Sequence, residues 1–363
     1  MKLLGGIEEG TAVQKIVYGI IGLGLILAAW IALTAGEQPL VTSGILPSPW
    51  RVITSFSDLL NDNELLRNTG ISIGLNLAGY IEAILITIPV GFIVGLMKFP
   101  RFGFMKQIEG FRYVPLTAVT GLFIVWFGID TDMKVHFLAF GILIYLLPVM
   151  VQRIDEVGDV YLKTAHTLGA TDWQIVKSVY FPSVLSRLSD DLRVLTAISW
   201  TYIIVAEGIN SSQGGLGALI YNVGQRQGRM DKLFALLILI ILIGIIQDRI
   251  FVWLDKELFP YKYQAKEAIK SSKLESKGLI RVIWEYAMMA MGWIVLGLYG
   301  LLMLCECVPI LGQFKPLSYL FGDTVWIIHI IVIAVVLLKT YTWYKKRQEQ
   351  TLLNQLTSKP AGK

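Results

Sequence analysis

Long apolar runs alternate with short polar segments along the whole chain. A helix needs about 20 mainly apolar residues to cross a bilayer, and several runs approach or exceed that length. In order, the candidate spans are Val17–Ala35, Thr69–Met97, Arg112–Phe127, Val135–Val151, Leu192–Glu207, Leu233–Leu254, Trp284–Leu304 and Val325–Tyr341. The strictly alternating short segments of a transmembrane β-barrel do not occur. The pattern therefore predicts an all-α polytopic membrane protein with about eight transmembrane helices.

Two of the segments between these runs are also informative. Within Gly44–Arg67, apolar residues recur near helical spacing after Pro47 and Pro49. This predicts a short amphipathic helix lying in the membrane interface. The stretch KFPRFGFMKQ, residues 98–107, is predicted to be a short basic loop.

The polar segment Asp159–Pro182 carries helical patterns of its own between two apolar runs. Its first half ends at Gly169, and glycine is a frequent helix stop. Thr171, followed by Gln174, fits the capping box that begins a helix, and Pro182 is expected to end that helix. The segment thus predicts two short helices that meet at a corner of small residues. Such a corner could enter a groove on a partner, and the alternative is an ordinary connector on the membrane surface.

Composition and charge support this interpretation. The chain is 55% hydrophobic and 16% charged, with a mean hydropathy of +0.61, which is too apolar for a soluble domain. With the N-terminus inside, 25 of the 32 Lys and Arg residues fall on one side. The positive-inside rule then places both termini and residues 159–182 in the cytoplasm. The first apolar run is longer than a signal-peptide core and is interpreted as a retained helix.

The sequence contains no pattern of catalytic or metal chemistry. A phosphate-binding G-x4-G-K-[ST] loop, a Ser/His/Asp arrangement and an HExxH motif are all absent. Cys305 and Cys307 and three scattered histidines cannot supply a metal site. No basic cluster is interleaved with aromatics, as nucleic-acid binding would need. We therefore expect no enzyme active site, no bound cofactor and no nucleic-acid partner.

Four segments, taken in order, resemble one family. They are ILPSPWRVI at Ile45–Ile53, the pattern Lys163-Thr164-Ala165, Gly169 and Phe181-Pro182, then VAEGINSSQGGLGALI at Val205–Ile220, and Gln247-Asp248-Arg249. Together they are similar to ABC importer permeases of the nitrate/sulfonate/taurine/bicarbonate type. The resemblance covers about residues 45–261 and implies a type I importer permease-like bundle in the bacterial inner membrane.

The resemblance also implies partners and a coupling site. It implies a homodimer with a second permease copy, two ABC ATPase subunits that hold ATP and Mg, and a periplasmic or lipid-anchored binding protein. By resemblance, the residues coupled to the ATPase are Lys163, Thr164, Ala165, Gly169, Ala170, Thr171 and Pro182. The family usually has Glu where Lys163 stands, and often a second proline where Ser186 stands. We expect a dedicated ATPase with an acidic residue facing Lys163.

This interpretation divides the chain into four parts. Residues 1–44 form an N-terminal transmembrane helix, and residues 45–261 form the permease core, with the coupling helices at 159–182. Residues 262–281 form a charged cytoplasmic linker. Residues 282–363 add two membrane helices and a basic tail that have no counterpart in the family core.

Polar residues within the spans are the candidates for a substrate path. They are Glu82, Glu207, Thr117, Thr120, Ser199 and Thr201. Glu82 could instead pair with a tyrosine or a backbone group, and each hydroxyl could bond its own helix backbone. We expect Glu207 to hydrogen-bond the predicted periplasmic loop containing Gly215, Leu216 and Gly217. The span centres contain no basic residue, so an anionic substrate would depend on helix dipoles, hydroxyls or the binding protein.

The sequence thus predicts a permease that moves a small, anionic solute by alternating access. A membrane scaffold whose polar segment only recruits a partner is the alternative of a different class. A channel or secondary transporter is disfavoured, because inverted repeats and ion-coordinating carboxylates in mid-span are not evident.

Overall fold

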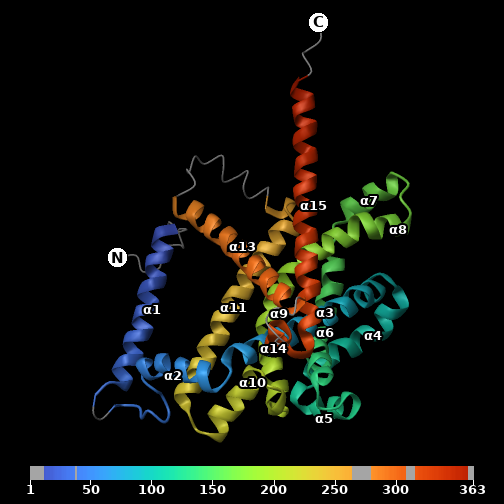
Figure 1. The fold of residues 1–363 in the computed structure, drawn as a ribbon. Coiled ribbons are helices and arrows are strands. Elements are labelled where there is room, and N and C mark those ends of the chain that lie inside the picture. The colour runs from blue at the N-terminus through green and yellow to red at the C-terminus, as the bar shows by residue number, and fades with distance from the viewer. Residues whose placement is uncertain (1–11, 37–38, 264–278, 308–314, 359–363) are drawn as a thin grey trace, which may run out of the picture. The chain divides into compact units, whose positions relative to one another are not determined.

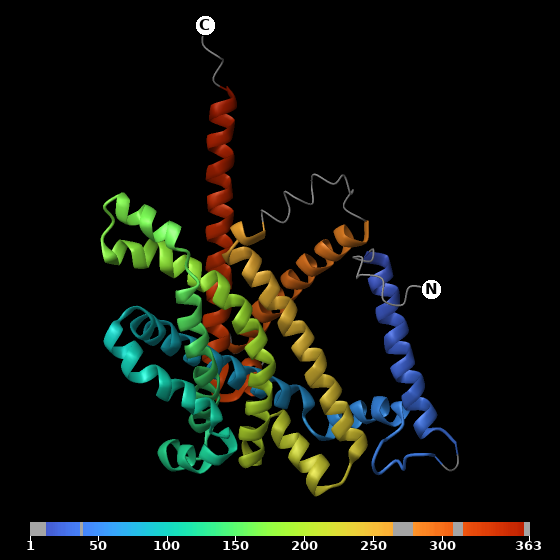
Figure 2. The same cartoon turned by 180° about the vertical axis from the view of Figure 1, so that it is seen from behind.

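The computed structural model describes residues 12–36, 39–263, 279–307 and 315–358, which are helical with short connections and contain no strand (Figures 1 and 2). The predicted all-α class is confirmed. The predicted linker 262–281 lies mostly outside these residues. The helical elements are α1 (Ala12–Thr34), α2 (Pro49–Asp62), α3 (Leu65–Leu96), α4 (Lys98–Gly110), η1 (Phe111–Tyr113), α5 (Leu116–Phe127), α6 (Thr131–Asp155), α7 (Asp159–Thr167), α8 (Asp172–Ile175), η2 (Val176–Tyr180), α9 (Phe181–Ile209), η3 (Ser211–Gln213), α10 (Leu216–Leu219), η4 (Ile220–Arg226), α11 (Met230–Leu258), α13 (Leu279–Cys307), α14 (Pro316–Phe321), η6 (Gly322–Thr324) and α15 (Val325–Ser358).

Most of the predicted spans coincide with these helices. Among the described residues, six helices are long and apolar enough to cross a membrane, and the bent pair of α4 and α5 makes a seventh if it is one span. α13 covers the predicted run Trp284–Leu304, and its stretch Gly292–Cys307 is a shorter apolar helix. The chain is therefore a multi-pass membrane protein by length and composition of its helices.

Contacts divide the chain into two units, Met1–Leu65 with Leu219–Ile241 and Leu66–Ala218 with Leu242–Lys363. In the first unit, the indole N–H of Trp30 in α1 donates to the carbonyl of Pro47 at 2.9 Å. The interfacial helix predicted within 44–67 is α2, which starts at Pro49, a residue well suited to a first helical turn. Ser55 of α2 donates to the carbonyl of Asp231 at 3.2 Å, so α2 is fixed to the start of α11.

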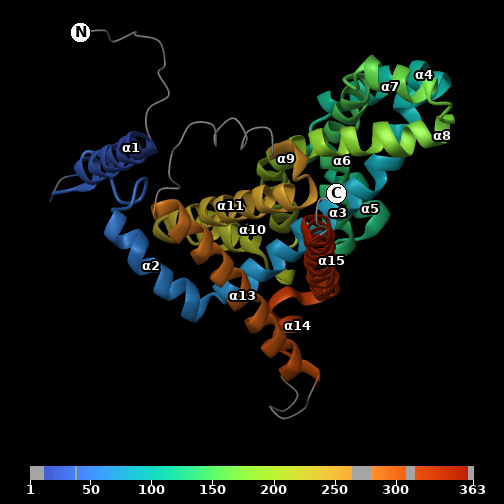
Figure 3. The same ribbon diagram turned by 90° about the horizontal axis from the view of Figure 1, so that it is seen from above.

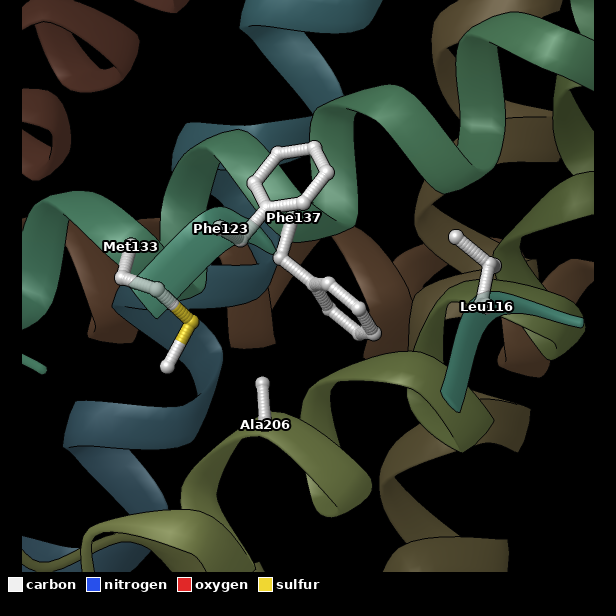
Figure 4. Packing of buried hydrophobic residues seen from close by; sticks show 5 residues of the cluster. All are labelled: Leu116, Phe123, Met133, Phe137 and Ala206. Carbon is white, nitrogen blue, oxygen red and sulfur yellow. The ribbon is translucent and has the colours of Figure 1, made fainter. Parts of the chain in front are cut away.

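The core of the second unit is the close packing of α3, α6 and α9. On α3, a side chain at Gly91 or Gly95 would collide with Met150 or Ile154 of α6, so glycine permits these helices to approach closely. α5 packs on α6 and α9 through a cluster shown in Figure 4, whose buried members are Leu116, Phe123, Met133, Phe137 and Ala206. This cluster fixes the position of α5.

Residues 98–107, predicted as a loop, instead belong to helix α4, which meets α5 at 105°. The predicted span Arg112–Phe127 is therefore not one helix. It starts within a short 3-10 turn that ends at Tyr113, and its α-helical part, α5, begins at Leu116. Val114 is extended because it precedes Pro115, whose ring disfavours a helical conformation in the preceding residue. The proline thus interrupts a segment whose hydropathy predicts one continuous helix.

The prediction that Pro182 ends a helix is wrong. α8, η2 and α9 form one uninterrupted helix, Asp172–Ile209, and Pro182 lies in the first turn of its α9 part. In η2 the backbone switches to wider π hydrogen bonding, with the Phe181 N–H donating to the Val176 carbonyl. A π turn shifts the carbonyl that would otherwise collide with the proline ring, so the helix continues through this residue.

The helices beyond the predicted core pack on it within the second unit. Figure 3 views α15 nearly end-on beside α3. At Gly70 and Gly74 of α3, any side chain would collide with Leu320 and Thr324 of the α14–η6 segment. Midway along α15, the Thr342 hydroxyl donates to the Glu257 carboxylate of α11 at 2.9 Å. The extension therefore packs on α3 and is hydrogen-bonded to α11.

Candidate functional site

Helices α7 and α8 form a compact hairpin at one end of α6 and α9 (Figure 1). α7 ends in a Schellman motif, in which the N–H of Gly169 donates to His166 at 2.9 Å and that of Ala170 donates to Ala165 at 3.1 Å. Gly169 has φ +76° and a Cβ there would meet nothing within 4 Å, so backbone conformation rather than packing requires the glycine. The predicted helix stop is confirmed.

The predicted capping box at the start of the second helix is also confirmed. The Thr171 hydroxyl accepts from the Gln174 N–H at 3.4 Å, and the Gln174 side chain accepts from the Thr171 N–H at 2.8 Å. These reciprocal bonds satisfy backbone donors that a helix start otherwise leaves free. The corner between the helices is thus set by local backbone bonds.

The hairpin presents large apolar side chains on its surface. Val160, Tyr161, Leu168 and Trp173 are each about 70% exposed or more. Lys163 is also exposed, 80% in its side chain, and its nearest carboxylate is Asp159 at 3.7 Å. Exposed apolar side chains of this kind are typical of protein or membrane interaction sites.

A network of ion pairs holds the base of the hairpin. Arg153, at the end of α6, binds Asp191 of α9 with two hydrogen bonds of 2.7 and 2.8 Å, and binds Glu156 with two more of 2.8 and 2.7 Å. Arg187 of α9 donates to the Glu156 carbonyl at 2.8 Å. The Arg153 guanidinium lowers the pKa of the Glu156 carboxyl below its ordinary value. These charge-assisted bonds tie the end of α6 to α9 at the point where the hairpin begins.

At the far end of α9, three successive backbone N–H groups each bind a different side chain. Gly215 donates to the Asn68 side chain at 2.7 Å, Leu216 to the Ser72 hydroxyl at 2.8 Å, and Gly217 to the Glu207 carboxylate at 2.7 Å. The second carboxylate oxygen of Glu207 accepts from Ser72 at 2.6 Å. The predicted bond from Glu207 to this loop is present. We call residues 214–217 the glycine loop.

Close packing explains two of the glycines in this loop. A side chain at Gly215 would overlap the Glu207 carboxylate, and one at Gly217 would overlap the Ile204 carbonyl. Glu207 is completely buried, and so is Lys134 of α6, which donates to the Asn210 carbonyl at 3.4 Å. The glycine loop is thus a buried polar joint between α3, α6 and α9.

The hairpin and the glycine loop lie at opposite ends of one helix. The uninterrupted helix Asp172–Ile209 has 38 residues, or about 57 Å at the usual rise per residue. Thr171 caps its first end and Glu207 stands in its last turn. This helix joins the exposed surface to the buried joint.

The other predicted path residues do not form one cluster. Ser199 is buried and donates to and accepts from Asn76 of α3, at 3.2 and 3.0 Å. Glu82 lies 2.7 Å from the Nδ1 atom of His136, a partner that the sequence did not indicate. Thr117 and Thr201 are exposed and Thr120 is half-buried, on α5 and α9.

Sequence reasoning missed the side chains of α3 that hold the glycine loop and α9. A signal was present, because Asn68, Ser72 and Asn76 follow one another at four-residue spacing and so share one helix face. It missed the buried Lys134 as well, for which no local pattern exists. Among the described residues, no group of three or more potential ligands could hold a metal ion.

The fold and these two sites define a multi-pass helical membrane protein in which one helix joins an exposed hairpin to a buried loop. Residues 69–260, more than half of the chain, match the family described as binding-protein-dependent transport system inner membrane component. The chain belongs to this family and is the permease component of an ABC importer, located in the inner membrane.

The match to several relatives covers most of each relative's length. An aliphatic sulfonates transport permease protein of Bacillus subtilis is 27% identical over 67% of this chain and 87% of its own. The taurine transport system permease protein of Escherichia coli is 25% identical over 58% and 78%. The nitrate import permease protein of Synechococcus elongatus is 24% identical over 66% and 89%. A MetNI methionine ABC transporter structure is 18% identical over 53% of this chain and 95% of that chain, with a TM-score of 0.48.

Proposed function

We propose that this chain imports a small anionic solute by alternating access, driven by two separate ATPase subunits that dock on the α7–α8 hairpin. The observation that carries the proposal is the single helix from Asp172 to Ile209, which ends at the exposed hairpin on one side and at Glu207 on the other. A helix of this kind can carry displacement between its ends without a break. The names of the sulfonate, taurine and nitrate relatives support an anionic substrate.

The hairpin is the part that we assign to the ATPase. Its exposed Leu168 and Trp173 supply apolar contact area, and Gly169 and Ala170 leave the corner narrow. The excess of basic residues on the same side of the chain supports a cytoplasmic position for this end. In this proposal the remaining coupling residues, Lys163 to Ala165 and Pro182, form the edges of the docking surface.

The test is reconstitution of the permease with its ATPase and binding protein in liposomes. Trp173→Ala should weaken ATPase binding by about tenfold or more, since buried aromatic contacts dominate interfaces. Trp293→Ala is the matched control, because Trp293 of α13 is 71% exposed against 73% for Trp173 and lies outside the hairpin. Equal ATPase binding by the two variants would contradict docking on the hairpin.

The same system tests Lys163 and separates a transporter from a scaffold. Lys163→Glu should weaken binding of a dedicated ATPase that presents an acidic residue there, and unchanged affinity and coupling would count against such a residue. Uptake that depends on ATP and binding protein supports the importer. ATPase recruitment without uptake of any offered solute would favour the scaffold.

A further inference from the structure

Arg112 lies at the break between α4 and α5, where the pair bends by 105°. Its Nη2 atom donates to the carbonyl of Tyr145 on α6 at 3.5 Å. Tyr145 lies well inside α6, ten residues before its final residue Asp155, or about 15 Å along the axis. The positive-inside count placed Arg112 on the cytoplasmic side, at the start of the predicted span Arg112–Phe127. The structure instead sets its guanidinium level with the middle of a membrane-spanning helix.

The positive charge of Arg112 is not balanced by a carboxylate. Its Nε is buried without a hydrogen-bond partner, and in the part of the chain that the structure describes Arg112 makes no ion pair. Other arginines of this protein do form ion pairs, namely Arg101, Arg153, Arg187, Arg193 and Arg229. An unpaired charge at membrane depth is energetically expensive and is a functional feature by default. Arg112 therefore has both charge and N–H donors available for a ligand.

The helix that follows Arg112 adds positive charge next to it. α5 starts at Leu116 with no side-chain cap on its first turn, so this helix end adds partial positive charge. Thr117 in the same turn is exposed. A guanidinium and a helix N-terminus together favour a bound anion.

This cluster is held rigidly but opens to the surface of the chain. Leu116 and the Tyr202 ring both pack on Gly141, where a Cβ would lie 2.8 and 2.7 Å from them. Next to Arg112, Tyr113 is 88% exposed. A cation at this depth must face a water-filled path or another protein rather than lipid chains. The break is thus a fixed, accessible position along the membrane.

We propose that Arg112 binds the anionic group of the solute during its passage, taking a small oxoanion such as a sulfonate or nitrate. The planar fork of a guanidinium matches two oxygens of such a group. The inference rests on the proposed import function. It gives the chain a basic residue at mid-span, which hydropathy alone did not reveal.

The experiment measures uptake of taurine, ethanesulfonate and nitrate by the complete complex in liposomes. Hydrogen bonds to a charged group contribute about 1.5–3 kcal/mol, so Arg112→Gln should lower uptake about tenfold to hundredfold at subsaturating solute. Arg112→Lys should lose less, because it keeps the charge without the fork. Arg101→Gln is the control for removing an arginine from the same helix pair, and it should leave the KM for the solute unchanged.

A second variant separates charge from folding. In a Cys305→Ser, Cys307→Ser background, Arg112→Cys is treated with a methanethiosulfonate after assembly. The aminoethyl reagent, which adds an ammonium, should restore uptake at least about threefold above the neutral methyl reagent.

The outcomes distinguish this inference from the proposed function. If the wild type imports one of the anions and Arg112→Gln imports it at the same rate, the inference about Arg112 is overturned while the proposed function stands. Equal uptake after both reagents, or failure of both Arg112 variants to assemble, would make Arg112 a structural residue and overturn the inference. A wild-type complex that imports none of the three anions would overturn both.

Discussion

The glycine loop makes a specific prediction, because three of its four amides are each held by a different side chain. Glu207→Ala removes the acceptor of the Gly217 N–H, which is buried and bonded at 2.7 Å. Leaving a buried donor unsatisfied costs about 1–3 kcal/mol. If exchange proceeds through local opening, the Gly217 amide should exchange about tenfold to hundredfold faster in this variant.

The neighbouring amides serve as internal controls. Leu216 still donates to Ser72 and Gly215 still donates to Asn68 after Glu207→Ala, so their exchange should change by less than about threefold. Ser72→Ala should instead release Leu216. Glu207→Gln keeps one acceptor oxygen and should largely preserve the protection of Gly217.

The assay is hydrogen–deuterium exchange of the purified permease, with fragmentation that resolves single amides. An unchanged Gly217 rate in Glu207→Ala would refute the assigned bond. If every variant released all three amides equally, the loop would open as one unit, and the reasoning from separate bonds would be wrong.

Three further predictions concern other parts of the chain. Gly169→Ala should destabilise the hairpin corner by about 1 kcal/mol, because its φ of +76° is unfavourable for a side chain; an unchanged thermal midpoint and unchanged ATPase binding would contradict this. Arg153 lowers the pKa of Glu156, so the ionised Glu156 stabilises the fold at neutral pH, and this stabilisation is lost as pH falls through the lowered pKa. The thermal midpoint of the wild type should therefore fall further between neutral pH and about pH 3 than that of Glu156→Gln. Equal falls in the two proteins would exclude the effect. Gly74→Leu should displace η6 from α3 and expose the extension to limited proteolysis, whereas a wild-type digestion pattern would show that the two do not touch.

The sequence was most informative where short-range chemistry decides the structure. Apolar length marked most of the spans, and the reciprocal bonds of Thr171 and Gln174 lie within one turn, so their residue types alone predict them. The bond from Glu207 to the glycine loop was expected from the family resemblance of residues 205–220. Its α3 partners could have been found from their four-residue spacing.

The remaining features depend on contacts between distant segments or on small changes of helix register. Pro182 stays within a helix because a π turn precedes it, and no residue pattern distinguishes that from a stop. Pro115 breaks the helix locally, but the direction that α5 takes after the break depends on its packing against α6 and α9. The depth of Arg112 follows from that bend, whereas the sequence placed it at the cytoplasmic end of a continuous span.

The packing of the C-terminal extension on α3 has a consequence for the evolution of permeases that carry such an extension. Gly70 and Gly74 form a bare stripe that Leu320 and Thr324 cover, on the same two turns whose opposite side holds the glycine loop through Asn68 and Ser72. A permease that gained or lost such an extension would have to change those two turns at the same time. Small residues at both positions should therefore accompany the extra helices from one genome to the next, and bulkier residues should accompany their absence.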